Sequence, residues 1–371
     1  MNKCKLGKLL KVKHGFAFKS ENYVEKSEYA LVTLANISST NDFQYNEEKT
    51  TYYGASFPSE FILKTGDLIM PLTEQVMGLF GNSAFVPYIK HTTFVLNQRV
   101  GKVLVDEEKA DKFFIHYLLS TDSVRNQLEY RASGTRQRNI SPEDVYDVEV
   151  FVPDLEEQRR IGKLLYALEQ RVYNNNCIND NLQQELCLIY EHIMSQAKKG
   201  LILGTHAIAS ELSEITTGRE DANFADTNGK YKFFTCSSET LKCNHYAFNS
   251  SSILIAGNGE FNVKHFSGKF NAYQRTYVLT PKQEHYGLLY LACLYQIKSF
   301  KSSSAGSIVK FITKGDIDNI PVFIPDDGTY LIQMNKLLDL QEMRLQENEK
   351  LLALRDFLLP LLMNGQATIA E

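Results

Sequence analysis

The 371-residue sequence has no apolar run long enough to cross a bilayer, and one of its longest, Phe357–Leu362, covers six residues. The basic N-terminus has no apolar stretch behind it, so it lacks the form of a secretory signal. These absences predict a cytoplasmic protein that does not enter a membrane.

Cysteine is scarce, with six residues and no Cys-x-x-Cys pair. This count does not suit a disulfide framework in a chain of this size. Cys236, Cys243 and His245 could be drawn as metal ligands, but their spacing matches no standard zinc arrangement and a fourth ligand is missing. We therefore predict no metal site and interpret the cysteines as small buried apolar residues.

The motifs of several enzyme classes are also missing. There is no Gly-x4-Gly-Lys-Ser/Thr phosphate loop, and no Asn/Asp-Pro-Pro-aromatic tetrapeptide of the kind expected in an adenine methyltransferase. Gly257-Asn258-Gly259 lacks a third glycine and is typical of a turn between strands. The sequence thus predicts no catalytic centre and no cofactor bound by this chain.

The formal net charge of −4 disfavours nucleic-acid binding, but the distribution of charge favours it. Residues 1–20 carry six lysines and no acid, and residues 125–140 carry four arginines against Glu129 alone. Residues 298–314 carry four lysines and no acid. Each cluster alone is also compatible with an ordinary solvated surface.

The chain contains an internal repeat, and two of the clusters occupy the same place in it. The pattern Gly-x5-Ile-x3-Asp-x3-Val/Ile-x-Val-Phe-x-Pro runs from Gly134 to Pro153 and recurs from Gly306 to Pro325, at a constant offset of 172. Upstream, Phe94-x3-Gln98-Arg99 resembles Phe270-x3-Gln274-Arg275. The sequence therefore holds two copies of one unit, each a long globular part followed by a helix.

The globular parts are rich in short β-branched and aromatic runs broken by turn residues, which predicts strands. The runs at 29–34, 67–70, 100–105, 231–234, 252–255 and 275–279 carry this signal. Each half also has one apolar helical stretch, at 113–128 and at 288–297. The predicted fold class is a mixed α+β one.

A heptad pattern follows each globular part. Apolar residues recur in alternating steps of four and three from Ile161 to Ile193, interrupted by Asn175 and Asn179, and leucines recur every seventh residue from Leu331 to Leu359. Asn348 matches Asn175 in the second seam, where such polar residues set register or mark a break. Pro360 is expected to stop or kink the second helix.

These signals predict four segments with the first globular domain at 1–153, the first helix at 154–199, the second domain at 200–325 and the second helix at 326–371. Either helix could pack on its own domain, but two of them favour antiparallel pairing. A helix over about 156–196 would extend roughly 60 Å. That is more than one turn of B-DNA, about 34–36 Å. We interpret the helices as a spacer between two DNA-reading domains related by a pseudo-two-fold axis.

Several side chains near the repeated motifs suit DNA contacts. Arg138 and its aligned partner Lys310 suit phosphates, and Arg99 and Arg275 suit guanine. Amide side chains such as Gln137 pair with adenine, although each of these residues could instead satisfy backbone groups at a turn. The complete set of predicted DNA-binding residues is Lys13, Lys19, Arg99, Arg136, Gln137, Arg138, Arg275, Lys301 and Lys310.

The segment from Gly134-Thr135-Arg136-Gln137 to Ile140, and the segment from Val150-Phe151-Val152-Pro153 to Glu157-Gln158, resemble signatures of type I restriction–modification specificity subunits. The segments Lys13–Ser20 and Gly268–Leu279 are similar to that family too. The resemblance covers essentially the whole chain, in the order recognition domain, spacer helix, recognition domain, spacer helix.

The resemblance implies a non-catalytic subunit that reads a split DNA target with two mixed α/β recognition domains. It also implies two partner modification subunits that methylate adenine with S-adenosylmethionine, and restriction subunits that use ATP and Mg²⁺. Glu157-Gln158 has no counterpart in the second copy, which puts equal docking of the two helices in doubt. The expected partner-binding residues are Glu157, Gln158, Ile161, Leu165, Leu168, Val172, Leu338, Leu345 and Leu352.

Two other functions were weighed. A coiled-coil assembly scaffold that binds no DNA would agree with the net negative charge. A self-contained nuclease could be drawn from Glu47-Glu48-Lys49 and Pro153-Asp154, with carboxylates converging on Mg²⁺. However, the second copy keeps Pro325-Asp326 without a matching Glu-x-Lys, so we interpret these turns as helix starts.

Overall fold

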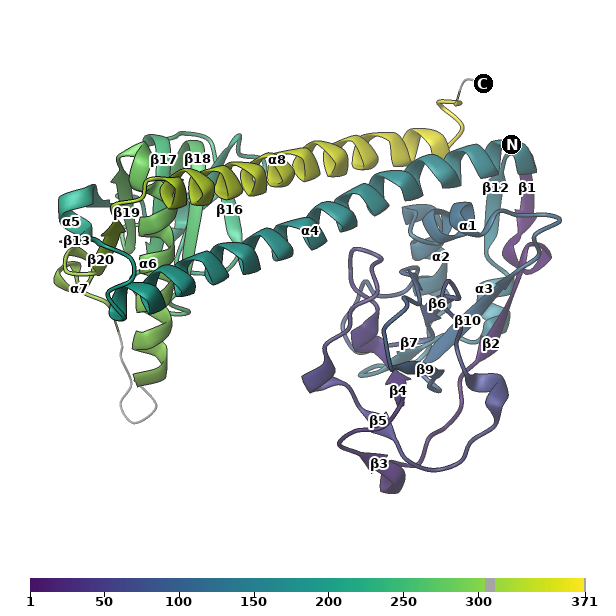
Figure 1. The fold of residues 1–371 in the computed structure, drawn as a ribbon. Coiled ribbons are helices and arrows are strands. Elements are labelled where there is room, and N and C mark those ends of the chain that lie inside the picture. Colours follow the sequence, from purple (N-terminus) through teal and green to yellow (C-terminus); the bar gives the residue numbers. More distant parts are fainter. Residues whose placement is uncertain (304–310, 370–371) are drawn as a thin grey trace. The chain divides into compact units, whose positions relative to one another are not determined.

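The computed structural model describes residues 1–303 and 311–369, and the chain divides into two compact units. Unit 1 comprises Met1–Arg171 with Lys350–Glu371, and unit 2 comprises Val172–Glu349. Each unit contains a stretch of both long helices, α4 (Leu155–Lys198) and α8 (Thr329–Met363) (Figure 1). Among the described residues, no helix has the length and apolar character needed to cross a bilayer.

Unit 1 is built on two four-stranded sheets, with the orders β2-β10-β6-β8 and β3-β5-β4-β9, and two short antiparallel pairs, β1-β12 and β7-β11. Its strands are β1 (Asn2–Lys5), β2 (Leu10–His14), β3 (Tyr23–Val24), β4 (Tyr29–Val32), β5 (Tyr52–Tyr53), β6 (Leu68–Pro71), β7 (Thr73–Glu74), β8 (Ala84–Phe85), β9 (Thr93–Leu96), β10 (Val100–Val105), β11 (Arg138–Asn139) and β12 (Glu149–Val152). Its shorter helices are α1 (Lys112–Leu119), α2 (Asp122–Arg131) and α3 (Pro142–Tyr146).

Unit 2 is built on one six-stranded sheet with the order β14-β19-β17-β18-β15-β16 and the antiparallel pair β13-β20. Its strands are β13 (Gly204–Ile208), β14 (Ser213–Thr217), β15 (Tyr231–Phe234), β16 (Thr240–Cys243), β17 (Phe248–Ala256), β18 (Val263–Ala272), β19 (Thr276–Pro281) and β20 (Pro321–Pro325). Its shorter helices are α5 (Ala209–Leu212), α6 (Tyr286–Ser303) and α7 (Lys314–Asp318), and α6 packs against β17 and β18 (Figure 1).

The internal repeat predicted from the sequence is confirmed. In unit 1, Ser141 and Asp144 form a reciprocal capping box at the start of α3, and in unit 2, Thr313 and Asp316 form the same box at the start of α7. The strand that follows each box pairs antiparallel with the first strand of its unit. The mixed α/β class is confirmed as well.

One predicted helix is wrong in detail. The stretch 113–128 forms two helices, α1 and α2, that are separated at Ser120 and Thr121. The two hydroxyls donate to the carbonyls of Tyr117 and Leu118, each at 2.8 Å, and Thr121 has an extended backbone. Such local side-chain bonds compete with the helical ladder, and the apolar periodicity does not register them.

Within each unit, the stretches of α4 and α8 run antiparallel. In unit 1, Arg355 reaches Glu169, and in unit 2, Gln341 donates to the carbonyl of Asn179. The buried apolar residues of both helices join the core of each unit, which keeps the helix pair attached to the sheets. Pro360 was expected to stop or kink α8, and it does not stop the helix, which continues to Met363.

A polar layer interrupts the apolar helix seam in unit 2. Asn175 is fully buried, and its amide donates to Asn348 Oδ1 at 2.8 Å, while Asn348 donates to Asn176 Oδ1 at 2.8 Å. Both helices continue through this layer without a break. The two asparagines therefore act as a register lock, since any sliding would leave buried amides without partners.

Each long helix approaches a shorter helix closely at one glycine, α4 at α1 and α8 at α6. The glycine is on the long helix in unit 1 and on the short helix in unit 2. In unit 1 it is Gly162 of α4, where a Cβ atom would collide with Asp111 Oδ1 and lie 2.7 Å from the Phe114 amide. In unit 2 it is Gly287 of α6, where a Cβ atom would lie 2.9 Å from Met334 Cβ. The amide of Gly287 donates to Asn335 Oδ1 at 2.7 Å.

Candidate nucleic-acid interface

The same exposed turn occurs in both units. In unit 1, the Arg99 carbonyl accepts from Leu72 N at 3.0 Å, and Leu72 O accepts from Ile140 N at 3.0 Å. Gln98 and Arg99 themselves are exposed. The backbone bonds hold the turn beside the segment that precedes Ile140.

In unit 2, the Arg275 carbonyl accepts from Gly257 N at 2.9 Å, and Gly257 O accepts from Ile312 N at 2.8 Å. Gln274 and Arg275 are exposed, like their counterparts in unit 1. They line a pocket of about 480 Å³ together with Asn258, Tyr277 and Phe311. Both units thus present a glutamine–arginine pair at an equivalent backbone position.

A second loop of unit 1 lies next to this turn. β7 follows Leu72 directly and pairs with β11, so that Thr73 opposes Asn139 and Glu74 opposes Arg138. Thr73 Oγ1 donates to Asn139 Oδ1 at 2.8 Å. The loops 73–81, 97–99 and 133–139 therefore meet on unit 1.

Arg138 is held inside the protein. Its guanidinium pairs with Glu74 Oε1 at 3.0 Å, donates to the Glu129 carbonyl at 2.7 Å and lies over the Phe80 ring. These contacts favour a structural role over the predicted phosphate contact. Arg136 is exposed, which leaves it better placed for DNA.

The other predicted DNA-binding residues are scattered. Gln137 donates to Asn139 Oδ1 at 3.3 Å, Lys13 pairs with Glu60 at 3.0 Å, and the exposed Lys19 lies 3.8 Å from Glu21. Lys310 and the side chain of Lys301 lie outside the part of the chain that the structure describes.

The predicted apolar partner-binding residues divide into three groups by exposure. Ile161, Leu165 and Leu338 are buried in the cores of their own units, and Leu345 is exposed. Leu168, Val172 and Leu352 are half-buried. Only the exposed part of this set is open to a partner.

Glu157 and Gln158 fix the start of α4. Glu157 Oε1 accepts from the Ile369 amide at 3.1 Å. Gln158 Oε1 accepts from the Asp111 amide at 3.2 Å, and Gln158 Nε2 donates to the Pro153 carbonyl at 3.0 Å. Both side chains are buried. These contacts favour a role in starting the helix over the predicted contact with a partner subunit.

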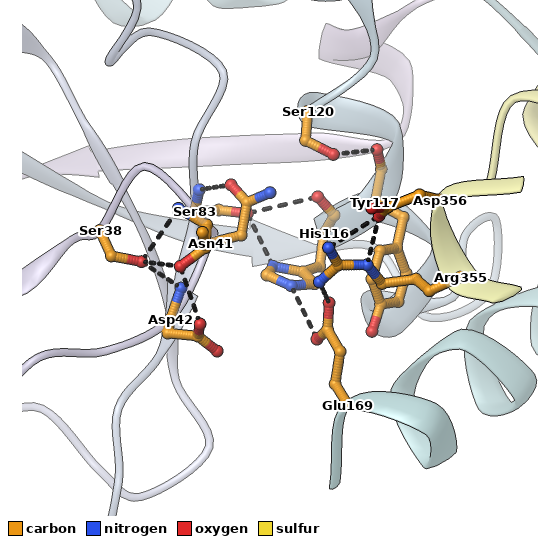
Figure 2. A network of polar contacts seen from close by, with 11 residues as sticks. Ser38, Asn41, Asp42, Ser83, His116, Tyr117, Ser120, Glu169, Arg355 and Asp356 are labelled. Atoms are coloured by element: carbon orange, nitrogen blue, oxygen red, sulfur yellow. Dashed lines mark hydrogen bonds and ion pairs between the residues drawn. The ribbon is translucent and has the colours of Figure 1, made fainter. Parts of the chain in front are cut away.

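A buried polar network links α1, α4 and α8 in unit 1 (Figure 2). His116 Nδ1 lies 2.8 Å from Ser83 Oγ, and His116 Nε2 lies 3.8 Å from Glu169 Oε2. Glu169 Oε1 lies 3.4 Å from Arg355. The three residue types are those of a hydrolytic triad, but Ser83 and His116 are at most 1% exposed and no substrate could reach the hydroxyl. The network anchors the two long helices.

His265 on β18 gives unit 2 a pH-dependent stability. Burial lowers the pKa of His265 from 6.5 to about 4, and the nearby charge of Lys232 adds to the effect. The unfolded chain therefore binds the proton more readily, and stability falls as the pH drops from above 6.5 toward 4. We expect unit 2 to lose about 1–2 kcal/mol between pH 7 and pH 5 through this residue, allowing for its partial exposure.

Urea unfolding at the two pH values would measure this loss in the wild type and in His265→Gln. The variant should show a smaller difference between pH 7 and pH 5, whatever its stability at pH 7. An unchanged difference would show that His265 takes up a proton as readily in the folded protein as in the unfolded chain.

Sequence reasoning missed two features of the interface. The buried Glu74 holds the loop 73–81 by accepting from its backbone amides. Val76 and Met77 are exposed at the tip of this loop. The available signal was the apolar pair Val76-Met77 directly before Gly78, but the sequence does not show whether such a pair is buried or exposed. Cys243, which could be drawn as a metal ligand with Cys236 and His245, donates to the His245 carbonyl. The described residues contain no group of three or more His, Cys, Asp and Glu side chains placed to hold a metal.

Comparison with known proteins identifies a family that this chain matches. The model of the type I restriction modification DNA specificity domain matches residues 1–184 and 209–342. The EcoDI specificity subunit of Escherichia coli is 38% identical over 165 residues, which are 43% of this chain and 37% of that protein. The MjaVIII specificity subunit of Methanocaldococcus jannaschii is 27% identical over 113 residues, 30% of this chain and 26% of that protein. The matches thus span about a third of these relatives.

The fold is also found in a solved structure. The S subunit of a type I restriction–modification system from M. genitalium superimposes with a TM-score of 0.65 at 17% identity, covering 98% of this chain and 96% of that one. At this identity the likeness shows the fold alone.

Proposed function

This chain belongs to the type I restriction modification DNA specificity family, and from that premise we propose that it reads a two-part DNA target for a restriction–modification complex. Each unit would read one half of the target. The observation that carries the proposal is the exposed Gln98-Arg99 turn of unit 1, repeated as Gln274-Arg275 in unit 2 on the same backbone frame.

The side chains of these turns suit base readout. An arginine fork pairs bidentately with guanine, and a glutamine amide pairs with adenine. The exposed Arg136 would contact phosphate and fix the orientation of unit 1 on the duplex. The pairing of α4 with α8 would set the gap between the two half-sites, with Asn175 and Asn348 holding the register.

The long helices would also dock the partner subunits. Exposed apolar residues on their surfaces, among them Tyr173, Leu188, Ile332, Met343 and Phe357, are candidates for this contact. The partners would supply S-adenosylmethionine-dependent adenine methylation and, where restriction subunits join, ATP- and Mg²⁺-dependent cleavage. Specificity subunits are in general non-catalytic, and this chain would supply recognition alone.

The test begins with adenine-methylation mapping of the host genome with and without this gene, which gives the target. The chain in complex with its modification subunits should then retard a duplex carrying the intact split target, and not a duplex in which either half is scrambled. Equal retention of both duplexes would contradict sequence reading. No retention of any duplex would favour the scaffold role.

Arg99→Ala and Arg275→Ala should each impair a different half of the target. Loss of one bidentate arginine–guanine pair is expected to weaken binding about tenfold, within the roughly 1–3 kcal/mol range of such contacts. Affinity for duplexes with single substitutions along both halves would locate each effect. Lys90→Ala, which removes an exposed cation on another loop of unit 1, is the control. Equal losses on all sequences would assign both arginines to phosphates.

A further inference from the structure

The loop between β7 and β8 exposes two apolar side chains on unit 1. Val76 is 80% exposed and Met77 is 73% exposed, and they lie between the exposed Gln75 and Gly78. Gly78 has a φ of +100°, in the region that favours glycine, and turns the chain back toward the core. Two adjacent apolar residues held out of the protein in this way suggest a surface that is covered by a ligand.

The base of this loop is rigid. Glu74 Oε2 accepts from the amides of Leu79 at 3.0 Å and Phe80 at 3.2 Å, and Oε1 pairs with Arg138. Phe80 is fully buried under the Arg138 guanidinium. The tip is therefore presented on a pre-formed frame, which lowers the entropy that binding must offset.

The surroundings of the tip point to a polyanion. The same loop leads from Leu72, whose amide binds the Arg99 carbonyl, and β7 pairs with the strand that follows Arg136. Both arginine side chains are exposed. An apolar tip flanked by cations matches a duplex, which has phosphates along its edges and apolar atoms within its groove.

We propose that Val76 and Met77 read thymine methyl groups in the half-site bound by unit 1. The thymine C5-methyl is the apolar group that the major groove offers for sequence readout. Valine and methionine can cover such a methyl, and neither provides a hydrogen bond that would favour another base. The proposal rests on the proposed DNA-reading function and deepens it.

The corresponding loop of unit 2 lacks this feature. The corresponding loop after β17 is Gly257-Asn258-Gly259-Glu260, whose tip is polar, and the apolar Phe261 that follows packs against the core. Methyl readout by a loop of this kind is therefore assigned to one half of the target. The half of the target bound by unit 2 therefore serves as a control for the thymine effect.

The test replaces each thymine of the target by deoxyuridine, which removes only the C5-methyl. Binding is measured for the complex of this chain with its modification subunits. The wild type should lose about fourfold in affinity at each contacted position, the amount expected for one buried methyl group. These positions should lie in one half-site only, the half that Arg99→Ala impairs.

The variant Val76→Ser/Met77→Ser should bind the thymine duplex more weakly than the wild type and should no longer distinguish uracil from thymine at those positions. Tyr88→Ser, which changes an equally exposed residue on another loop of unit 1, should keep the wild-type uracil effect. Retention of the split target by the double variant would confirm that unit 1 is folded.

Three results would overturn the proposal. The first is a wild type that is indifferent to uracil throughout the unit 1 half-site, or a half-site without thymine. The second is a double variant with an unchanged uracil effect. The third is weaker binding by the variant with no uracil effect in either protein, which would indicate an apolar wedge between bases. Failure of the wild type to prefer the split target would instead remove the proposed function.

Discussion

Glu74→Ala is expected to destabilise unit 1 by about 3–5 kcal/mol, the range for breaking a buried ion pair from one side. Glu74 is 1% exposed, and the change would leave the Leu79 and Phe80 amides without their acceptor and the Arg138 guanidinium without its carboxylate. Urea unfolding followed by circular dichroism would measure the loss. The variant should also lose the preference for one half of the target.

The second unit offers a matched control. Glu260 lies in the corresponding loop, is exposed and accepts from the Ser238 amide, so Glu260→Ala should cost less than about 1 kcal/mol. Glu74→Gln combined with Arg138→Met should recover part of the stability, because the glutamine oxygen still accepts from the loop amides and no buried charge remains. A loss below 1 kcal/mol for Glu74→Ala would mean that water replaces the carboxylate.

Glu169→Ala should destabilise unit 1 by about 2–3 kcal/mol, less than the roughly 3–5 kcal/mol for a fully buried pair because the Glu169 side chain is partly exposed. The change removes the carboxylate between His116 and Arg355 (Figure 2). Arg355 keeps its contact with the exposed Asp356 at 2.8 Å, so part of its charge stays compensated. The measurement is urea unfolding, with hydrogen exchange of α1 reporting whether the loss is local to the network.

Glu156→Ala is the control on the same helix, because Glu156 pairs with Arg159 at the surface and its loss should cost less than about 0.5 kcal/mol. Adding Arg355→Met to Glu169→Ala should restore stability by removing the uncompensated charge. Additive losses in the double variant would contradict a direct interaction between the two residues.

The repeat, the mixed fold class and the two long helices could be predicted because they depend on patterns that recur along the chain. The offset of 172 placed the two capping boxes, and the heptads placed α4 and α8. Apolar periodicity does not encode interactions between distant polar side chains. The hydrogen bond from Asn175 to Asn348 could be anticipated only because both residues occupy the predicted helix seam.

The site was predicted less completely for the same reason. Arg99 and Arg275 occupy the same place in a repeated motif that is visible in the sequence, and both are exposed. Arg138 belongs to the same basic cluster as Arg136, but its contact with Glu74 joins residues 64 positions apart in the chain. Only the paired strands β7 and β11 bring these two side chains together.

The two glycine crossings limit which globular half can pack against which long helix. Where α4 crosses α1, the glycine is Gly162 of the long helix α4, and where α8 crosses α6, it is Gly287 of the short helix α6. A crossing of α1 with α8 would therefore contain neither glycine. The reciprocal crossing of α6 with α4 would contain both and leave a gap. Each globular half therefore fits the long helix that follows it in the chain better than it fits the other long helix.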